Sequence, residues 1–169
     1  MGFPIDRSRT IISAMILGRR VTAQDVAWLR REVFAGGVVT REEADELFAV
    51  ARAGMNNASE WKEFFVEMIT RHVVRQSEPM GVVSEERAAW LLTRVDEGRS
   101  VEALAALVNV LAEAHSVPEW LLDAGRARVS SGWPNAGQAP PTATTGQLHT
   151  SGRAQKVGPL RRPVQRVIE

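Results

Sequence analysis

Gly37-Val38-Val39-Thr40-Arg41-Glu42-Glu43-Ala44 recurs 44 positions later as Gly81-Val82-Val83-Ser84-Glu85-Glu86-Arg87-Ala88. In both copies a glycine and two valines lead into a hydroxyl residue and then glutamates, which is the pattern of a loop that enters a capped helix. Each copy also follows a segment with helical periodicity. The repeat therefore predicts an all-α fold built from a duplicated helix–loop–helix pair.

Apolar residues spaced three and four apart predict about six helices. The predicted helices cover residues 23–35, 41–53, 59–76, 85–96, 101–115 and 118–129. Thr22 with Asp25 marks the start of the first helix, while Thr40 with Glu43 and Ser116 with Glu119 predict capping boxes. Because segment 101–115 is apolar nearly all round, we expect it to be sandwiched between other helices.

The end of the first Gly-Val-Val loop is similar to the second half of a calcium-binding EF-hand loop, with Glu43 at the place of the bidentate glutamate. Two earlier oxygen donors are missing, and the second copy has Arg87 where a carboxylate is required. We therefore expect neither loop to bind calcium, and we expect Glu43 to cap its helix. The candidate metal ligands are Glu32, Glu42 and Glu43. Paired loops of this type predict a minimal two-stranded antiparallel bridge, with Val38-Val39 against Val82-Val83.

The composition fits one helical domain with appendages: 169 residues, 44% of them hydrophobic, with a net charge of +1. The absence of cysteine suits a reducing compartment, so we expect a cytoplasmic protein. The apolar run 11–17 is seven residues long, whereas a membrane-spanning helix needs about 20. The sequence therefore predicts no transmembrane segment.

The charge divides the chain into three parts: a basic and apolar arm (1–20), a helical domain (21–130) and a Pro-, Gly- and Thr-rich tail (131–169) that we expect to be disordered. The tail carries five basic residues against Glu169, which points to a negatively charged contact: nucleic acid, an acidic protein face or the domain itself. The sequence leaves open whether the arm packs on the domain or on a partner.

No motif for catalysis or for a cofactor is present, so we expect a protein that is not an enzyme and needs no cofactor. His72 lies on an apolar helix face, and His115 lies at a helix end. Asp45 belongs to a run of carboxylates that reads as a solvated helix face, whereas Trp28 and Trp90 are candidates for an exposed contact surface. The candidate partner-binding residues are Trp133, Arg161, Arg162, Arg166 and Ile168.

Residues 21–129 resemble uncharacterised proteobacterial helical proteins related to the tellurite-resistance TerB-like group. The resemblance is carried by the two Gly-Val-Val turns and by Trp61-Lys-Glu-Phe-Phe-Val-Glu67. It implies an all-helical domain that acts as a protein-interaction module, as an accessory subunit of a larger assembly, or as a divalent-cation sensor. A further alternative is weak nucleic-acid binding through the tail, which we do not expect because its arginines are not interleaved with aromatic residues. The oligomeric state is left open.

Overall fold

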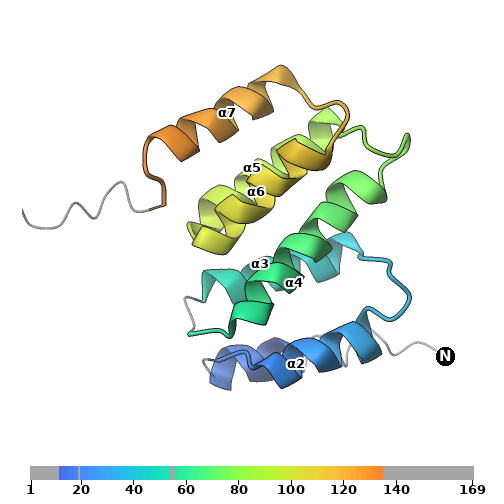
Figure 1. The fold of residues 1–169 in the computed structure, drawn as a ribbon, viewed down its shortest axis with the longest axis vertical. Coiled ribbons are helices and arrows are strands. Elements are labelled where there is room, and N and C mark those ends of the chain that lie inside the picture. The colour runs from blue at the N-terminus through green and yellow to red at the C-terminus, as the bar shows by residue number, and fades with distance from the viewer. Residues whose placement is uncertain (1–11, 19, 54–55, 135–169) are drawn as a thin grey trace, which may run out of the picture. The chain divides into compact units, whose positions relative to one another are not determined.

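The computed structural model describes residues 12–18, 20–53 and 56–134, which form seven helices (Figure 1). A helical segment at 12–18 is followed by α2 (Ala23–Trp28), which continues into the π-helical turn η1 (Leu29–Val33), and by α3 (Arg41–Arg52). Helix α4 (Ser59–Thr70) continues into the π-helical turn η2 (Arg71–Arg75) and is followed by α5 (Glu85–Gly98). The last two are α6 (Val101–Glu113) and α7 (Glu119–Ser130). The all-α prediction is confirmed.

The helix starts follow the predicted capping chemistry at two of three places. Thr22 with Asp25 and Thr40 with Glu43 form complete capping boxes, in which each side chain satisfies a backbone N–H of the first turn. The capping box predicted for Ser116 and Glu119 is wrong. The N-cap of α7 is Pro118, which makes no side-chain capping bond, because the strand-like bridge described below holds Ser116 outside the helix.

Consecutive helices follow one another as α2–η1 and α3, α4–η2 and α5, and α6 and α7, and we call these three successive pairs hairpins. The first helices of the hairpins pack side by side in the order α2, α4, α6, as Figure 1 shows from bottom to centre. Polar pairs tie these neighbours together: Arg30 with Glu67 at 2.6 Å, Thr70 with Asn109 at 2.9 Å, and Arg75 with Glu113 at 2.9 Å. Because the partners advance in the same direction along α4–η2 and α6, these two helices are parallel.

The second helices also pack parallel, and three of the contacts between α3 and α5 keep the same offset. From α3 to α5, three interactions join residues 45 positions apart: Arg41 with Glu86, Asp45 with Trp90, and Arg52 with Glu97. From α5 to α7, Glu85 meets Trp120 and Asp96 meets Arg128. The hairpins are therefore stacked in chain order, and α3 of the first hairpin also contacts α6 of the third.

This stacking corrects the predicted bridge between the two Gly-Val-Val loops. Among the described residues, the single β-bridge is parallel and joins Val82 to Ser116, between the second and third hairpins. The Val83 N–H donates to the Ser116 carbonyl at 2.9 Å, and the His115 N–H donates to the Gly81 carbonyl at 2.8 Å. An antiparallel ladder needs two units related by a two-fold axis, whereas stacked hairpins place their loops side by side in the same direction.

The first loop satisfies its backbone through side chains of the second hairpin. The Val39 N–H donates to Gln76 Oε1 at 2.9 Å, and Gln76 Nε2 donates to the Val39 carbonyl at 3.2 Å. His72 Nδ1 lies 2.8 Å from the same carbonyl, so in the neutral form it is the protonated ring nitrogen. The amide of Gln76 thus takes the place of a strand partner.

One close approach explains the glycine of the second loop. Gly81 has a φ of +86°, and a Cβ placed there would lie 2.7 Å from Nδ1 of His115. A side chain at this position would therefore strain the backbone and push away the segment that forms the parallel bridge.

The core runs continuously through the hairpins and includes the arm. Phe48, Phe65 and Trp90 pack edge to face, with ring centroids 5.1 and 5.8 Å apart. Ile12 and Met15 are buried in the same cluster, so the described part of the arm packs on the helical body. None of the helices in the described ranges is long and apolar enough to cross a membrane.

Replacing Gln76 tests the link between the first two hairpins. Gln76→Ala leaves the Val39 N–H without its acceptor in a half-buried place, so we expect the free energy of unfolding to fall by about 1–2 kcal/mol. Urea denaturation measures the change. Gln24→Ala, on the exposed face of α2, is the control and should change stability by less than about 0.5 kcal/mol. Equal effects of the two substitutions would show that the Gln76 amide does not hold the loop.

The protonation of His72 gives the fold a predictable pH dependence. Burial lowers the pKa of His72 from its ordinary value of 6.5, and the charges of Arg87 and Arg41 lower the pKa further, against the opposing effects of the Val39 hydrogen bond and Asp45. The unfolded state therefore binds the proton more readily, so stability is fully present above pH 6.5 and is lost as the pH falls below this value.

We expect the free energy of unfolding to decrease between pH 7.5 and pH 5, in part through His72. His72→Gln keeps a donor for the Val39 carbonyl but does not titrate, so its curve should be flatter over this interval. Denaturation at a series of pH values compares the two slopes, and parallel curves would contradict the assignment.

Candidate functional site

The three candidate metal ligands are engaged in local contacts or lie in solvent. Glu32 pairs with its neighbour Arg31 at 2.7 Å. The Glu43 carboxylate accepts from the Thr40 N–H at 2.8 Å, as its capping role requires, and Glu42 is exposed in the first turn of α3. Within the ranges that the structure describes, no group of three or more His, Asp or Glu side chains is placed to hold a metal ion.

The candidate partner-binding residues fall mostly outside the structure's described ranges. Trp133 is described. Its side chain is partly buried against the core, and its backbone N–H donates to the Arg128 carbonyl at 3.2 Å. Part of its ring surface is therefore already used by the fold. The other four, Arg161, Arg162, Arg166 and Ile168, lie outside the described residues.

Trp90 and Asp45 differ from their sequence-based interpretation. Trp90 is buried, with 6% of its surface exposed, so it is not an exposed contact residue. Its Nε1–H donates to Asp45 Oδ1 at 2.9 Å, which means that Asp45 is not simply part of a solvated carboxylate face. The polar end of a core tryptophan needs an acceptor, and the helix beside it supplies one.

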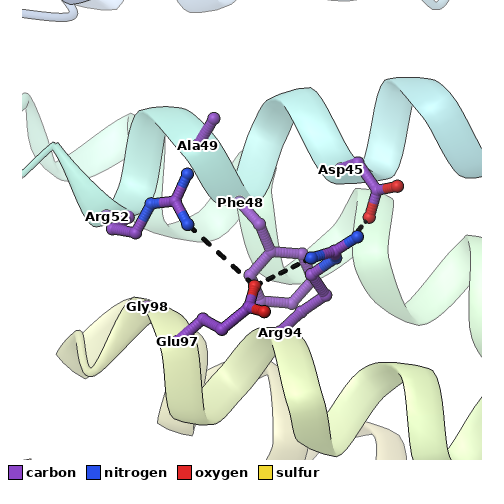
Figure 2. Close-up of a pocket in the computed structure, with 7 residues that line it drawn as sticks. All are labelled: Asp45, Phe48, Ala49, Arg52, Arg94, Glu97 and Gly98. Atoms are coloured by element: carbon purple, nitrogen blue, oxygen red, sulfur yellow. Dashed lines mark hydrogen bonds and ion pairs between the residues drawn. The ribbon is translucent and has the colours of Figure 1, made fainter.

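Asp45 belongs to a charged cleft between α3 and α5 that Figure 2 shows in close-up. Arg94 Nε donates to Asp45 at 2.7 Å, and the same guanidinium reaches Glu97 at 2.8 Å. Arg52 faces Glu97 from the other helix at 4.0 Å, and Phe48 lines the cleft between them. The cleft has a volume of about 220 Å³.

The charges of this cleft compensate one another. The hydrogen bond that Arg94 donates to Asp45, and next the one that it donates to Glu97, raise the pKa of Arg94, as expected for a guanidinium between two carboxylates. The two cations and two anions leave no net charge for a charged ligand to neutralise. We therefore interpret the cleft as a polar contact that fixes α3 against α5.

A second hollow lies between α4 and α6 and differs in character. It is a shallow groove of about 570 Å³ whose lining is apolar along α6 except for Asn109 and mixed along α4. The lining residues are Ser59, Lys62, Glu63, Val66, Ala105, Val108, Asn109 and Ala112.

The groove exposes one face of α6, which corrects the expectation that this helix is sandwiched. Its inner positions, such as Leu107 and Val110, are fully buried against α4, α5 and α7. Val101 and Val108, however, expose 52% and 44% of their surface. Together with Ala105 and Ala112 they form a stripe at spacings of four, three and four residues, which we call the α6 stripe; Ala105, Val108 and Ala112 line the groove, and Val101 extends the stripe beyond it.

Sequence reasoning missed the α6 stripe because it counted α6 as apolar all round. A signal was present: Val101, Ala105, Val108 and Ala112 form their own helical face, separate from the face of Ala103, Leu107 and Val110. What the periodicity could not show is which apolar face has a neighbour.

We found no match to this chain among protein-family models, among curated proteins or among solved structures. The functional argument therefore depends on the geometry of the chain itself.

Asp45 and Arg52 offer a matched test of the charged cleft. Asp45→Ala leaves the Trp90 indole N–H without its acceptor and leaves Arg94 with Glu97 alone, so we expect the free energy of unfolding to fall by about 1–3 kcal/mol. Arg52→Ala removes only a long, exposed pair and should cost about 0.5 kcal/mol or less. Denaturation midpoints measure both, and near-equal losses would refute the central role of Asp45.

Proposed function

We propose that this chain is a non-enzymatic helical protein-interaction module that docks a protein partner in the groove between α4 and α6. The observation that carries the proposal is the α6 stripe. Val101 and Val108 lie seven residues apart, on one face of one helix, and both are substantially exposed. Contiguous apolar surface of this kind is typical of a contact site.

The surroundings of the stripe favour a protein partner over a small ligand. The groove is open and shallow, and its lining is divided evenly between apolar residues and four polar or charged ones, which are Ser59, Lys62, Glu63 and Asn109. An enclosed site with several convergent polar groups would be expected for a small molecule. Parallel neighbouring helices in stacked hairpins commonly offer such a surface to a helix or a peptide.

The proposal extends to parts of the chain that the sequence alone addresses. The basic tail, with Arg161, Arg162, Arg166 and Ile168, would add contacts to the same partner or assembly, and the absence of cysteine supports a cytoplasmic location. The resemblance to TerB-like proteins implies the same class of function. The metal-sensor alternative is not favoured by the positions of Glu32, Glu42 and Glu43.

Affinity purification with a matched pair of substitutions tests this function. Val108→Lys places a charge in the groove, whereas Val129→Lys places the same charge on an exposed valine of α7. We expect proteins that co-purify with the tagged chain to be depleted about tenfold or more by Val108→Lys and unchanged by Val129→Lys, as measured by quantitative mass spectrometry. If Val108→Lys retains every partner that Val129→Lys retains, the groove is not the docking site.

A further inference from the structure

We infer that the loop before α3, residues 36–39, is an acid-sensitive latch that protonation of His72 releases while the rest of the fold stays closed. The polar links that hold this loop on the second hairpin come from three side chains of η2 and its C-cap: Arg71, His72 and Gln76. Among the described residues, no backbone–backbone hydrogen bond joins the loop to that hairpin. A loop that is held by side chains alone can open without breaking a backbone ladder.

Two of the three side chains meet at one backbone carbonyl. His72 Nδ1 lies 2.8 Å from the Val39 carbonyl, and Gln76 Nε2 donates to the same oxygen at 3.2 Å. The loop begins with a pair of glycines, and Gly37, the second of them, has a φ of +69°. The backbone can bend at this pair, so the loop has a hinge at one end and the His72 contact at the other.

The charges around His72 are mostly positive. The charged groups that face its ring are Arg41 and Asp45 of α3 and Arg87 of α5. Burial has the largest effect and lowers the pKa of His72, and the two arginines lower it further. Asp45 acts in the opposite direction, but its carboxylate is already paired with Arg94 at 2.7 Å. A proton on His72 therefore adds a positive charge to a buried cluster that already contains two arginines.

Both arginines are fixed by other contacts, so they do not move away from the new charge. Arg87 donates to three backbone carbonyls at the end of η2. The Arg41 guanidinium lies 5.1 Å from the centroid of the Trp90 ring and also pairs with Glu86 at 3.3 Å. The Trp90 ring in turn packs edge to face on His72, with centroids 5.2 Å apart. The repulsion is therefore relieved by movement of the imidazolium itself.

The loop is the part of the surroundings that this movement displaces. Only 9% of the His72 surface is exposed, so the imidazolium reaches water when the loop that accepts its Nδ1–H lifts. The second loop has no such trigger, because its Val83 N–H donates to the Ser116 carbonyl in a bridge between two backbones.

Proton linkage sets the pH at which the latch opens. In the open loop His72 returns to its ordinary pKa of 6.5, whereas in the closed loop its pKa is lower. The population of the open loop is therefore constant above pH 6.5 and rises as the pH falls below this value, by about tenfold per pH unit at most.

Hydrogen exchange of single backbone amides in the full chain tests the latch. After correction for the intrinsic exchange rate, we expect the protection factor of the Val39 N–H to fall about threefold or more between pH 7 and pH 5. This exchange should not respond to dilute urea, because a local opening exposes little surface. The Val83 N–H is the comparison and should remain more protected at both pH values.

Three variants identify the trigger. In His72→Gln, which keeps a donor but does not titrate, the protection of Val39 should not depend on pH. Arg41→Gln removes one of the repelling cations, so the fall between pH 7 and pH 5 should be smaller than in the natural chain. Arg52→Gln is the control: it removes an arginine of the same helix about 16 Å further along and should leave the fall unchanged. Circular dichroism confirms that each variant is folded.

Two results would overturn the inference. If the protection of Val39 does not change with pH, or changes equally in His72→Gln, protonation of His72 does not release the loop. If the exchange of Val39 at pH 5 responds to urea as strongly as the unfolding of the whole chain does, the loop does not open by itself.

Discussion

The structure depends on the parallel packing of equivalent helices in successive hairpins. Between α3 and α5 three polar contacts join residues 45 positions apart along the helices, and Arg94 adds a bond to Asp45, 49 positions away. The offset of 45 nearly equals the 44-residue period of the Gly-Val-Val repeat, so the first hairpin lies on the second almost by translation. A translation keeps the loops within the hairpins at one end of the stack and makes them run in the same direction.

The backbone bonds of the loops follow from that geometry. Two loops that run in the same direction can form a parallel bridge, as Val82 and Ser116 do, but they cannot form the antiparallel ladder of a two-fold pair. Where the neighbouring loop does not reach, side chains supply the missing partners, and Gln76 and His72 do this for Val39. The polar groups at the ends of the core are thus satisfied from the next hairpin along the chain, which couples the stability of neighbouring hairpins.

Local features of the fold were predictable from the sequence, whereas the relation between the units was not. Helix positions follow from periodicity and from capping boxes such as that of Thr40 and Glu43, which depend on neighbours in the chain. A sequence repeat states that two units are alike, but a two-fold axis and a translation both satisfy it. The sequence does not identify the third hairpin as a repeat, because it lacks the Gly-Val-Val turn and has Pro118 as the N-cap of its second helix. The sequence also does not show that Trp90 is buried against Asp45, because their contact depends on the register between α3 and α5.

The outer face of the first-helix layer gives the strongest reason to assign a role to the α6 stripe. Stacking covers the sides of a helix that face the neighbouring hairpins, but it leaves the outer side in water, where the fold requires only polar residues. On α2–η1 the exposed positions include Arg30, Arg31 and Glu32, and on α4 they include Lys62 and Glu63. On α6 the equivalent surface carries Val101 and Val108, which remain 52% and 44% exposed in the fold and so leave apolar surface in contact with water. Two valines at that place therefore contribute little to the stability of the single chain, and they would contribute when a second helix covers them.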